Sequence, residues 1–284
     1  MRLLLKYKIL LLLFFKIIFI QSAHGQKVEI SNDSLRKIVV EAGRAFEKLD
    51  NKSSLEYSQK ALNLAYETQN YAYIARIYNL LGLNYTEFTD YRKAEDAYLK
   101  GIDAAIKANE LEVESWLDSN LATLYQVHFK QHDKALDYHL KSLAYSKKIE
   151  SDYDILLSYL NITILFFDID NYKDGIVYLN KADDYIFKIN EGATYITYYS
   201  LYALYYNHFK NYEKAEESYL LSLKYCEDNR YDLQGVHAME LYDDIAHFYA
   251  AHNDKNKGYD YLVKHLTLKD SLYSVEKTET IANY

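Results

Sequence analysis

Small and aromatic residues recur along this chain at a nearly fixed interval, and together they predict pairs of packed helices. In the clearest copy, Tyr78, Leu81, Gly82 and Tyr85 are followed by Ala94. Residues three and four apart share one face of a helix, so this spacing indicates two successive helical stripes. The counterparts of Gly82, at steps of 40, 41, 40 and 43 residues, are Ala122, Thr163, Ala203 and Ala246. A fixed period of this size is typical of stacked helical hairpins.

A second small residue follows each of these positions and marks the second helix of the hairpin. The offset is 12 residues, except in the third copy, where it is 13. We assign the extra residue to the turn from His128 to Asp133. Small side chains on both helices would let the two backbones approach closely. These second positions are Ala94, Ala135, Gly175, Ala215 and Gly258.

The whole chain reads as almost entirely helical, with about six hairpins over residues 31–274. It has no proline among 284 residues, whereas average usage is about 5%, and proline breaks helix interiors. A weaker first copy has a first helix from about Asp33 to Leu49, with Ala42 and Ala45 in the frame. The polar turns between helices contain Asn and Asp, which tolerate left-handed backbone and cap the next helix. Residues 275–284 read as a C-terminal helix or the start of a coiled-coil linker.

The frame from Tyr78 to Tyr98 resembles the tetratricopeptide repeat family at almost every position. The resemblance implies a right-handed superhelical solenoid whose first helices line a concave groove. Two features depart from the family. The period is about 40 residues rather than 34, which also overlaps the range of HEAT and armadillo repeats, and the proline that usually closes the second helix is absent. Both departures favour longer helices.

The first 25 residues read as a secretory signal peptide. A basic start at Arg2 precedes an apolar run that only Lys16 interrupts, and Ala23 and Gly25 form a small-x-small cleavage site before Gln26. We therefore expect an exported protein, in the periplasm or cell envelope. The alternative is an uncleaved segment that anchors the chain to the membrane.

The net charge argues against a nucleic-acid partner, and the aromatic and cysteine residues read as packing residues. The formal net charge is −8, which disfavours binding to phosphate backbones, so we expect no nucleic-acid partner. Most of the 33 tyrosines read as core and seam aromatics. Cys226 is the only cysteine and reads as a small buried hydrophobe.

No motif in the sequence indicates an enzyme, a cofactor or a metal site. There is no glycine-rich phosphate loop, nucleophile elbow or His-Glu-x-x-His. His128 and His132 are four residues apart, but the sequence places no third ligand beside them, so they read as a surface pair.

The expected function is therefore binding of a protein or peptide segment in the concave groove of an exported scaffold. Trp116 is the only tryptophan and a candidate anchor, or else a packing residue between first helices. The groove is expected to run from polar through an apolar middle to acidic. The candidate groove residues are Arg76, Asn79, Trp116, Ser119, Thr123, Gln126, Leu160, Asn207, Glu240, Asp243 and His247.

An alternative function follows from the tail and the family resemblance. Exported bacterial regulators anchored in the membrane carry similar repeat arrays, followed by a span and an output domain. The chain would then be the sensory input domain of a histidine kinase or a helix-turn-helix transcriptional regulator. A downstream apolar stretch of about 20 residues would favour this alternative, and it or an uncleaved signal segment would give contact with a membrane.

Overall fold

A computed structural model describes residues 26–48, 50–189, 192–228 and 236–282. Predictions about the signal segment at residues 1–25 lie outside this part of the chain. The described residues contain helices and no strand, which confirms the predicted all-α architecture. Pairs of helices form six hairpins, in chain order: α1 (Gln26–Glu47) and α2 (Asn51–Glu67); α3 (Tyr71–Glu87) and α4 (Tyr91–Ala108); α5 (Leu111–Leu124) and α6 (His132–Lys148); α7 (Asp152–Asp168) and α8 (Tyr172–Ile186); α9 (Gly192–His208) and α10 (Tyr212–Asp228); α11 (Val236–Ala251) and α12 (Lys255–Ala282).

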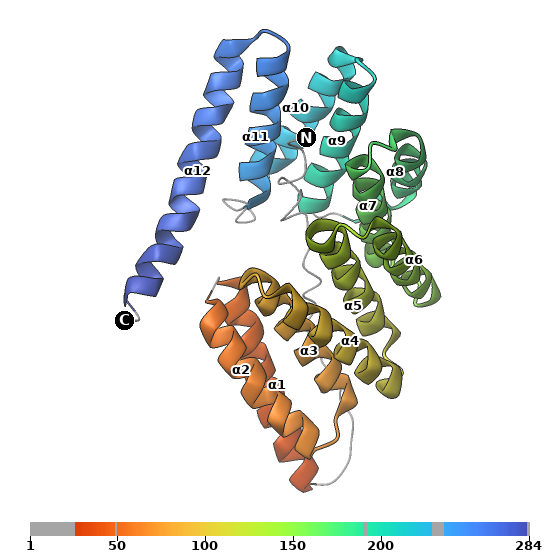
Figure 1. The fold of residues 1–284 in the computed structure, drawn as a ribbon, viewed down its shortest axis with the longest axis vertical. Coiled ribbons are helices and arrows are strands. Elements are labelled where there is room, and N and C mark those ends of the chain that lie inside the picture. The colour runs from red at the N-terminus through yellow and green to blue at the C-terminus, as the bar shows by residue number, and fades with distance from the viewer. Residues whose placement is uncertain (1–25, 49, 190–191, 229–235, 283–284) are drawn as a thin grey trace. The chain divides into compact units, whose positions relative to one another are not determined.

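The described chain divides into two compact units, residues 26–154 and residues 155–282, with the boundary in the first turn of α7. The N-terminal unit contains the first three hairpins and the C-terminal unit the last three. Figure 1 shows the two helices of a hairpin lying side by side, for example α1 with α2 and α11 with α12. Helix α12 is 28 residues long, whereas its partner α11 has 16. Residues 275–282 continue α12 without a break.

The small residues of the repeat frame are buried in all six hairpins. A side chain at Gly82 would meet the ring of Tyr98, because an added Cβ would lie 2.3 Å from that ring. At Gly258 the nearest atom is the carbonyl oxygen of Ala246, at 3.1 Å. At both positions a larger side chain would collide with the partner helix of the hairpin, which agrees with the packing predicted from the repeat frame.

Tyrosines form the seams between successive hairpins within each unit. The Tyr125 hydroxyl donates a hydrogen bond to Glu95 on the preceding hairpin, at 2.7 Å. Histidines at the ends of first helices also lie against tyrosines that begin the preceding second helix. Their ring centroids are 3.8, 3.8 and 4.0 Å apart in the pairs Tyr91 with His128, Tyr172 with His208, and Tyr212 with His252.

The turns use Asn and Asp differently from the prediction. Eight turn residues in the described part of the chain have left-handed backbone, but only three of them are Asn or Asp; Thr89, Lys130 and Lys210 are among the others. Asn and Asp more often stand one position later, where they cap the next helix. Asp90, for example, accepts a hydrogen bond from the Lys93 amide at 3.3 Å. At the cap position a short side-chain acceptor stabilises the next helix. At the left-handed position other residues are tolerated, because the surrounding contacts hold one strained residue in place.

Candidate functional site

The candidate groove residues on α3 are already engaged with neighbouring helices. Arg76 is half-buried, and its guanidinium Nη2 lies 3.2 Å from Glu110 Oε2. Asn79 is buried, and its Oδ1 accepts a hydrogen bond from Asn120 Nδ2 at 2.8 Å. The asparagine pair ties α3 to α5, so first helices of successive hairpins cover each other at this point.

Helix α5 and the turn that follows it carry four candidate residues, and three of them are buried. Trp116, Ser119 and Gln126 have almost no exposed surface. Thr123 is half-buried, and its hydroxyl donates to the Ser119 carbonyl at 3.0 Å. A ligand on this face could therefore contact Thr123 directly, whereas the other three side chains are buried beneath neighbouring residues.

The extra residue of the third hairpin lies inside the first helix, so its assignment to the turn was wrong. Residues Tyr125–Phe129 form a π-helical turn, η2, at the end of α5. The Gln131 amide donates to the Tyr125 carbonyl, at 2.9 Å, and Lys130 and Gln131 then repeat the left-handed and cap positions of the other turns. The π turn accommodates the inserted residue within the helix.

The third hairpin also buries a carboxylate at a position where four of the other five hairpins have tyrosine. Asp118 is at the frame position of Tyr78 and Tyr159 and is buried on α5. No hydrogen bond or ion pair joins its carboxylate to another described residue. Burial raises the pKa of Asp118 to about 7; the charge of Lys141 lowers it and that of Glu114 raises it further.

Other polar side chains fill the contact between α5 and α6. The Ser115 hydroxyl lies 3.0 Å from the Ser142 hydroxyl and 2.8 Å from the Ser146 hydroxyl, all three buried. His139 is buried beside them in the frame, and burial lowers its pKa to about 3, so the ring is neutral. The sequence signals of this polar hairpin were the offset of 13 residues and the Asp at a tyrosine position.

In the C-terminal unit, the candidate residues lie on three first helices. Leu160 is buried on α7, and Asn207 is half-buried on α9. On α11, Glu240 and Asp243 are half-buried and His247 is exposed. On α11, two of these side chains are in contact: His247 Nδ1 lies 3.2 Å from Asp243 Oδ1.

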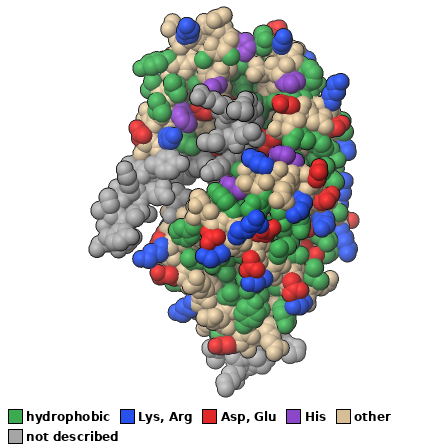
Figure 2. Space-filling model, viewed as in Figure 1, with side chains coloured by type: hydrophobic (Ala, Val, Ile, Leu, Met, Phe, Trp, Pro, Cys, Tyr) green, Lys and Arg blue, Asp and Glu red, His purple; other side chains and the backbone are tan. Residues whose placement is uncertain are grey.

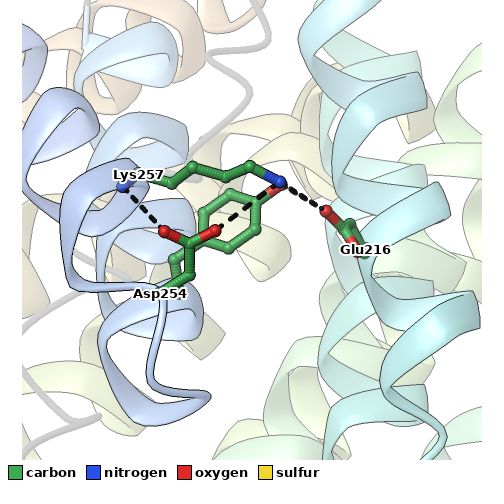
Figure 3. A network of polar contacts seen from close by, with 4 residues as sticks. Glu216, Asp254 and Lys257 are labelled. Carbon is green, nitrogen blue, oxygen red and sulfur yellow. Dashed lines mark hydrogen bonds and ion pairs between the residues drawn. The ribbon is translucent and has the colours of Figure 1, made fainter.

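A half-open furrow between α10 and α12 was not anticipated from the sequence. Its volume is about 780 Å³, and its walls include Leu220, Tyr259 and Val263, which are exposed. At one end, Lys257 Nζ lies 3.4 Å from Glu216 Oε1 and joins the two helices (Figure 3). The signal for this surface was a recurring Leu or Val five residues after the second small residue, which stays exposed at Leu99, Leu140, Leu220 and Val263.

The described residues contain no group of three or more His, Cys, Asp or Glu side chains that could hold a metal ion. His128, considered above as a metal ligand, stacks on the Tyr91 ring. On the face drawn in Figure 2, Lys and Arg side chains are interspersed with Asp and Glu. Among the described helices, none has the length and apolar character that crossing a membrane requires.

No protein-family model matches the sequence, and no curated protein matches it. Solved structures do match its fold. The apo form of RapI shares 13% identity with the chain at a TM-score of 0.67, over 88% of this chain and 86% of that one. A Rap protein complexed with competence and sporulation factor shares 15% identity at a TM-score of 0.58, over 89% and 78% of the two chains.

A third match names the repeat. It is a signal transduction ATPase with numerous domains and a tetratricopeptide repeat sensor, from Pyrococcus horikoshii. It shares 18% identity at a TM-score of 0.62, over 88% of this chain and 38% of that one. Six hairpins with buried small residues agree with these matches. The chain therefore has the helical-repeat fold of the tetratricopeptide repeat proteins.

Proposed function

We propose that this chain is a non-enzymatic, exported scaffold that binds a protein or peptide segment along its first helices. The observation that carries the proposal is the departure of α5 from the repeat frame, where Asp118 replaces a tyrosine and η2 widens the helix end. Local departures from an otherwise consistent pattern tend to occur at functional sites, and so do π turns. The Rap protein complexed with competence and sporulation factor supports binding as the activity of such a fold.

The expected ligand has an apolar core and a flanking Lys or Arg. Thr123 on α5 is half-buried, and Trp116 and Gln126 in the same hairpin are buried. Within the C-terminal unit, described by itself, Glu240 and Asp243 supply negative charge on α11. Complementary charges across an interface raise association rates and select the orientation of the partner.

Export rests on the first 25 residues, with their basic start, apolar run and small-x-small site before Gln26. We expect a mature N-terminus at Gln26 and a periplasmic or envelope location. Mass spectrometry of the cell fractions tests this step separately from binding. Intact Met1 on protein from the soluble cytoplasmic fraction would contradict it.

Capture of partners from the native cell envelope tests the binding face. We expect Thr123→Arg, and Glu240→Lys combined with Asp243→Lys, to reduce captured partner at least about tenfold, because rim and buried charge changes of this kind weaken complexes by such factors. Lys148→Ala, an exposed change on α6, serves as the control. Circular dichroism verifies that each variant is folded. Folded variants that retain every partner would place binding on another surface.

A sensory input domain is the second candidate, and the length of α12 favours it. Its 28 residues continue past the 16 of α11 as one uninterrupted helix, which could carry a binding signal to an output domain. The Pyrococcus horikoshii neighbour is described as having a tetratricopeptide repeat sensor. The test is to read the gene beyond the codon of Tyr284: an apolar stretch of about 20 residues would support this candidate.

A further inference from the structure

Helix α12 carries an apolar stripe that faces away from α11. Four large apolar side chains on it are 66%, 38%, 42% and 47% exposed: Tyr259, Leu262, Val263 and Leu266. At 100° per residue they lie within an arc of about 100° on the helix. The opposite side of α12 packs on α11, where His265 contacts the Met239 carbonyl at 2.9 Å. Tyr259 and Val263 also line the furrow beside α10, and none of the four side chains belongs to the buried core of this part of the chain.

The preceding hairpin shows what normally covers these positions. Leu262 and Leu266 correspond in the frame to Tyr219 and Leu223, which are only 3% and 8% exposed. The Tyr219 ring lies 5.4 Å from the ring of Phe248 on α11. In that hairpin, the first helix of the next hairpin thus covers the same face. The stripe on α12 has the composition of a helix-packing surface.

The stripe also ends in opposite charges. Lys255 precedes the apolar residues and Asp270 follows them, both on the same arc and both exposed. No ion pair joins either one to another described residue. The spacing is symmetric about the midpoint between Leu262 and Val263. An antiparallel copy of the same helix would therefore set Lys255 against Asp270 at both ends.

We propose that the chain forms a two-fold symmetric dimer through antiparallel pairing of α12 with its counterpart in a second copy. Tyr259 would lie opposite Leu266, and Leu262 opposite Val263, across the axis. The paired segment, from residue 255 to residue 270, is about 22 Å long at 1.5 Å per residue. A two-fold interface uses the same patch on both subunits and requires such self-complementarity.

A single pair of helices makes a small interface. Stable complexes bury about 1,200–2,000 Å² in total, and smaller interfaces are usually transient. We therefore expect a dissociation constant in the micromolar range. Burial of the four apolar side chains supplies the attraction, while the two charge pairs fix the antiparallel register.

Sedimentation equilibrium of the full chain, from about 1 to about 200 μM, tests the proposal. We expect a monomer–dimer equilibrium that Lys255→Asp and Asp270→Lys each weaken at least about tenfold, since like charges would then face each other. An equimolar mixture of these two variants restores opposite charges at both ends and should dimerise again. Asp260→Lys, an exposed change on another side of α12, is the matched control.

Three results would overturn the proposal. The chain could remain monomeric throughout the concentration range, which would leave the stripe to a different protein or to another segment of the chain. It could dimerise with an affinity that neither charge reversal changes, which would place the interface elsewhere. Finally, the mixture of folded variants could fail to associate, which would exclude the antiparallel register. None of these results bears on partner capture by the first helices.

Discussion

The third and fourth hairpins fill the same repeat frame with opposite chemistry. In α5 and α6 the contact contains Ser115, Ser142 and Ser146, joined by hydrogen bonds. The matched positions in α7 and α8 are Leu156, Ala182 and Ile186, all without exposed surface. Likewise, Asp118 and His139 of the third hairpin correspond to Tyr159 and Leu179 in the fourth. All of these residues are buried.

The small frame residues are common to the two hairpins, whereas the other buried positions are polar in the third hairpin and apolar in the fourth. The frame residues Ala122 with Ala135 and Thr163 with Gly175 are small and buried in both hairpins. An apolar filling gains free energy from burial, whereas a polar filling costs free energy unless every group is paired. The serines are paired, but neither ring nitrogen of His139 has a hydrogen-bond partner. The buried polar groups therefore lower the stability of the third hairpin, and such local departures from a consistent pattern are typical of functional regions.

The largest loss of stability should follow when a buried apolar residue of the fourth hairpin is replaced by the serine that the third hairpin has at the matched position. We expect Leu156→Ser to lower the free energy of unfolding by about 3–5 kcal/mol, because it leaves a cavity and an unpaired hydroxyl. Urea denaturation measures the loss, with the exposed change Lys173→Ser as the control. A loss below about 1 kcal/mol would mean that α7 tolerates polar filling as α5 does.

Replacing a small frame residue of the third hairpin by a larger residue should lower the free energy of unfolding. Ala122 has no exposed surface, so Ala122→Leu should cost about 1–3 kcal/mol through overpacking. The control Lys148→Ala, on the exposed side of α6, should stay within about 0.5 kcal/mol. Equal denaturation midpoints for the two variants would show that the small residue does not set the helix approach.

Asp118 should make stability depend on pH. Its pKa is raised by burial to about 7, above the value of 3.8 for an unperturbed carboxyl. The folded state therefore holds a proton that the unfolded state releases, and this group costs more as pH rises from about 4 to about 7. Asp118→Asn should stabilise the chain by about 1–3 kcal/mol at pH 8, with the gain shrinking as pH falls towards 4. Unfolding curves at several pH values provide the measurement, and a gain that is independent of pH would contradict the assignment.

The smallest effect concerns the turn after η2. Lys130 has left-handed backbone with φ of 55°, a conformation that glycine adopts without strain. We expect Lys130→Gly to raise stability by about 0.5–1 kcal/mol, and thermal unfolding can detect this. A decrease would show that the Lys130 side chain contributes more than the backbone strain costs.

The spacing of small and aromatic residues was sufficient to predict the helical hairpins, because each copy has the same steric requirement. Gly82 against Tyr98 and Gly258 against Ala246 are contacts that any larger residue would disturb, so they remain visible in sequence. The insertion in the third hairpin was misplaced because its length appears in the spacing, while its location depends on hydrogen bonds. Tyr125 could accept from Gln131 only after the helix widened.

The groove residues were harder to place. They were chosen from the outward side of each first helix taken alone, but neighbouring first helices cover part of that side. The hydrogen bond between Asn79 and Asn120 is one such contact. The polar character of α5 was visible in Asp118, yet its burial depends on packing that no single helix reveals.

Amide hydrogen exchange of the full chain, with and without a captured partner, tests the central claim most directly. Binding along the first helices predicts slower exchange in α5 and η2, extending to other odd-numbered helices, with little change in the even-numbered ones. Protection reports the free energy of local opening, so each helix is read separately. Protection confined to the even-numbered helices or to the turns would contradict the account.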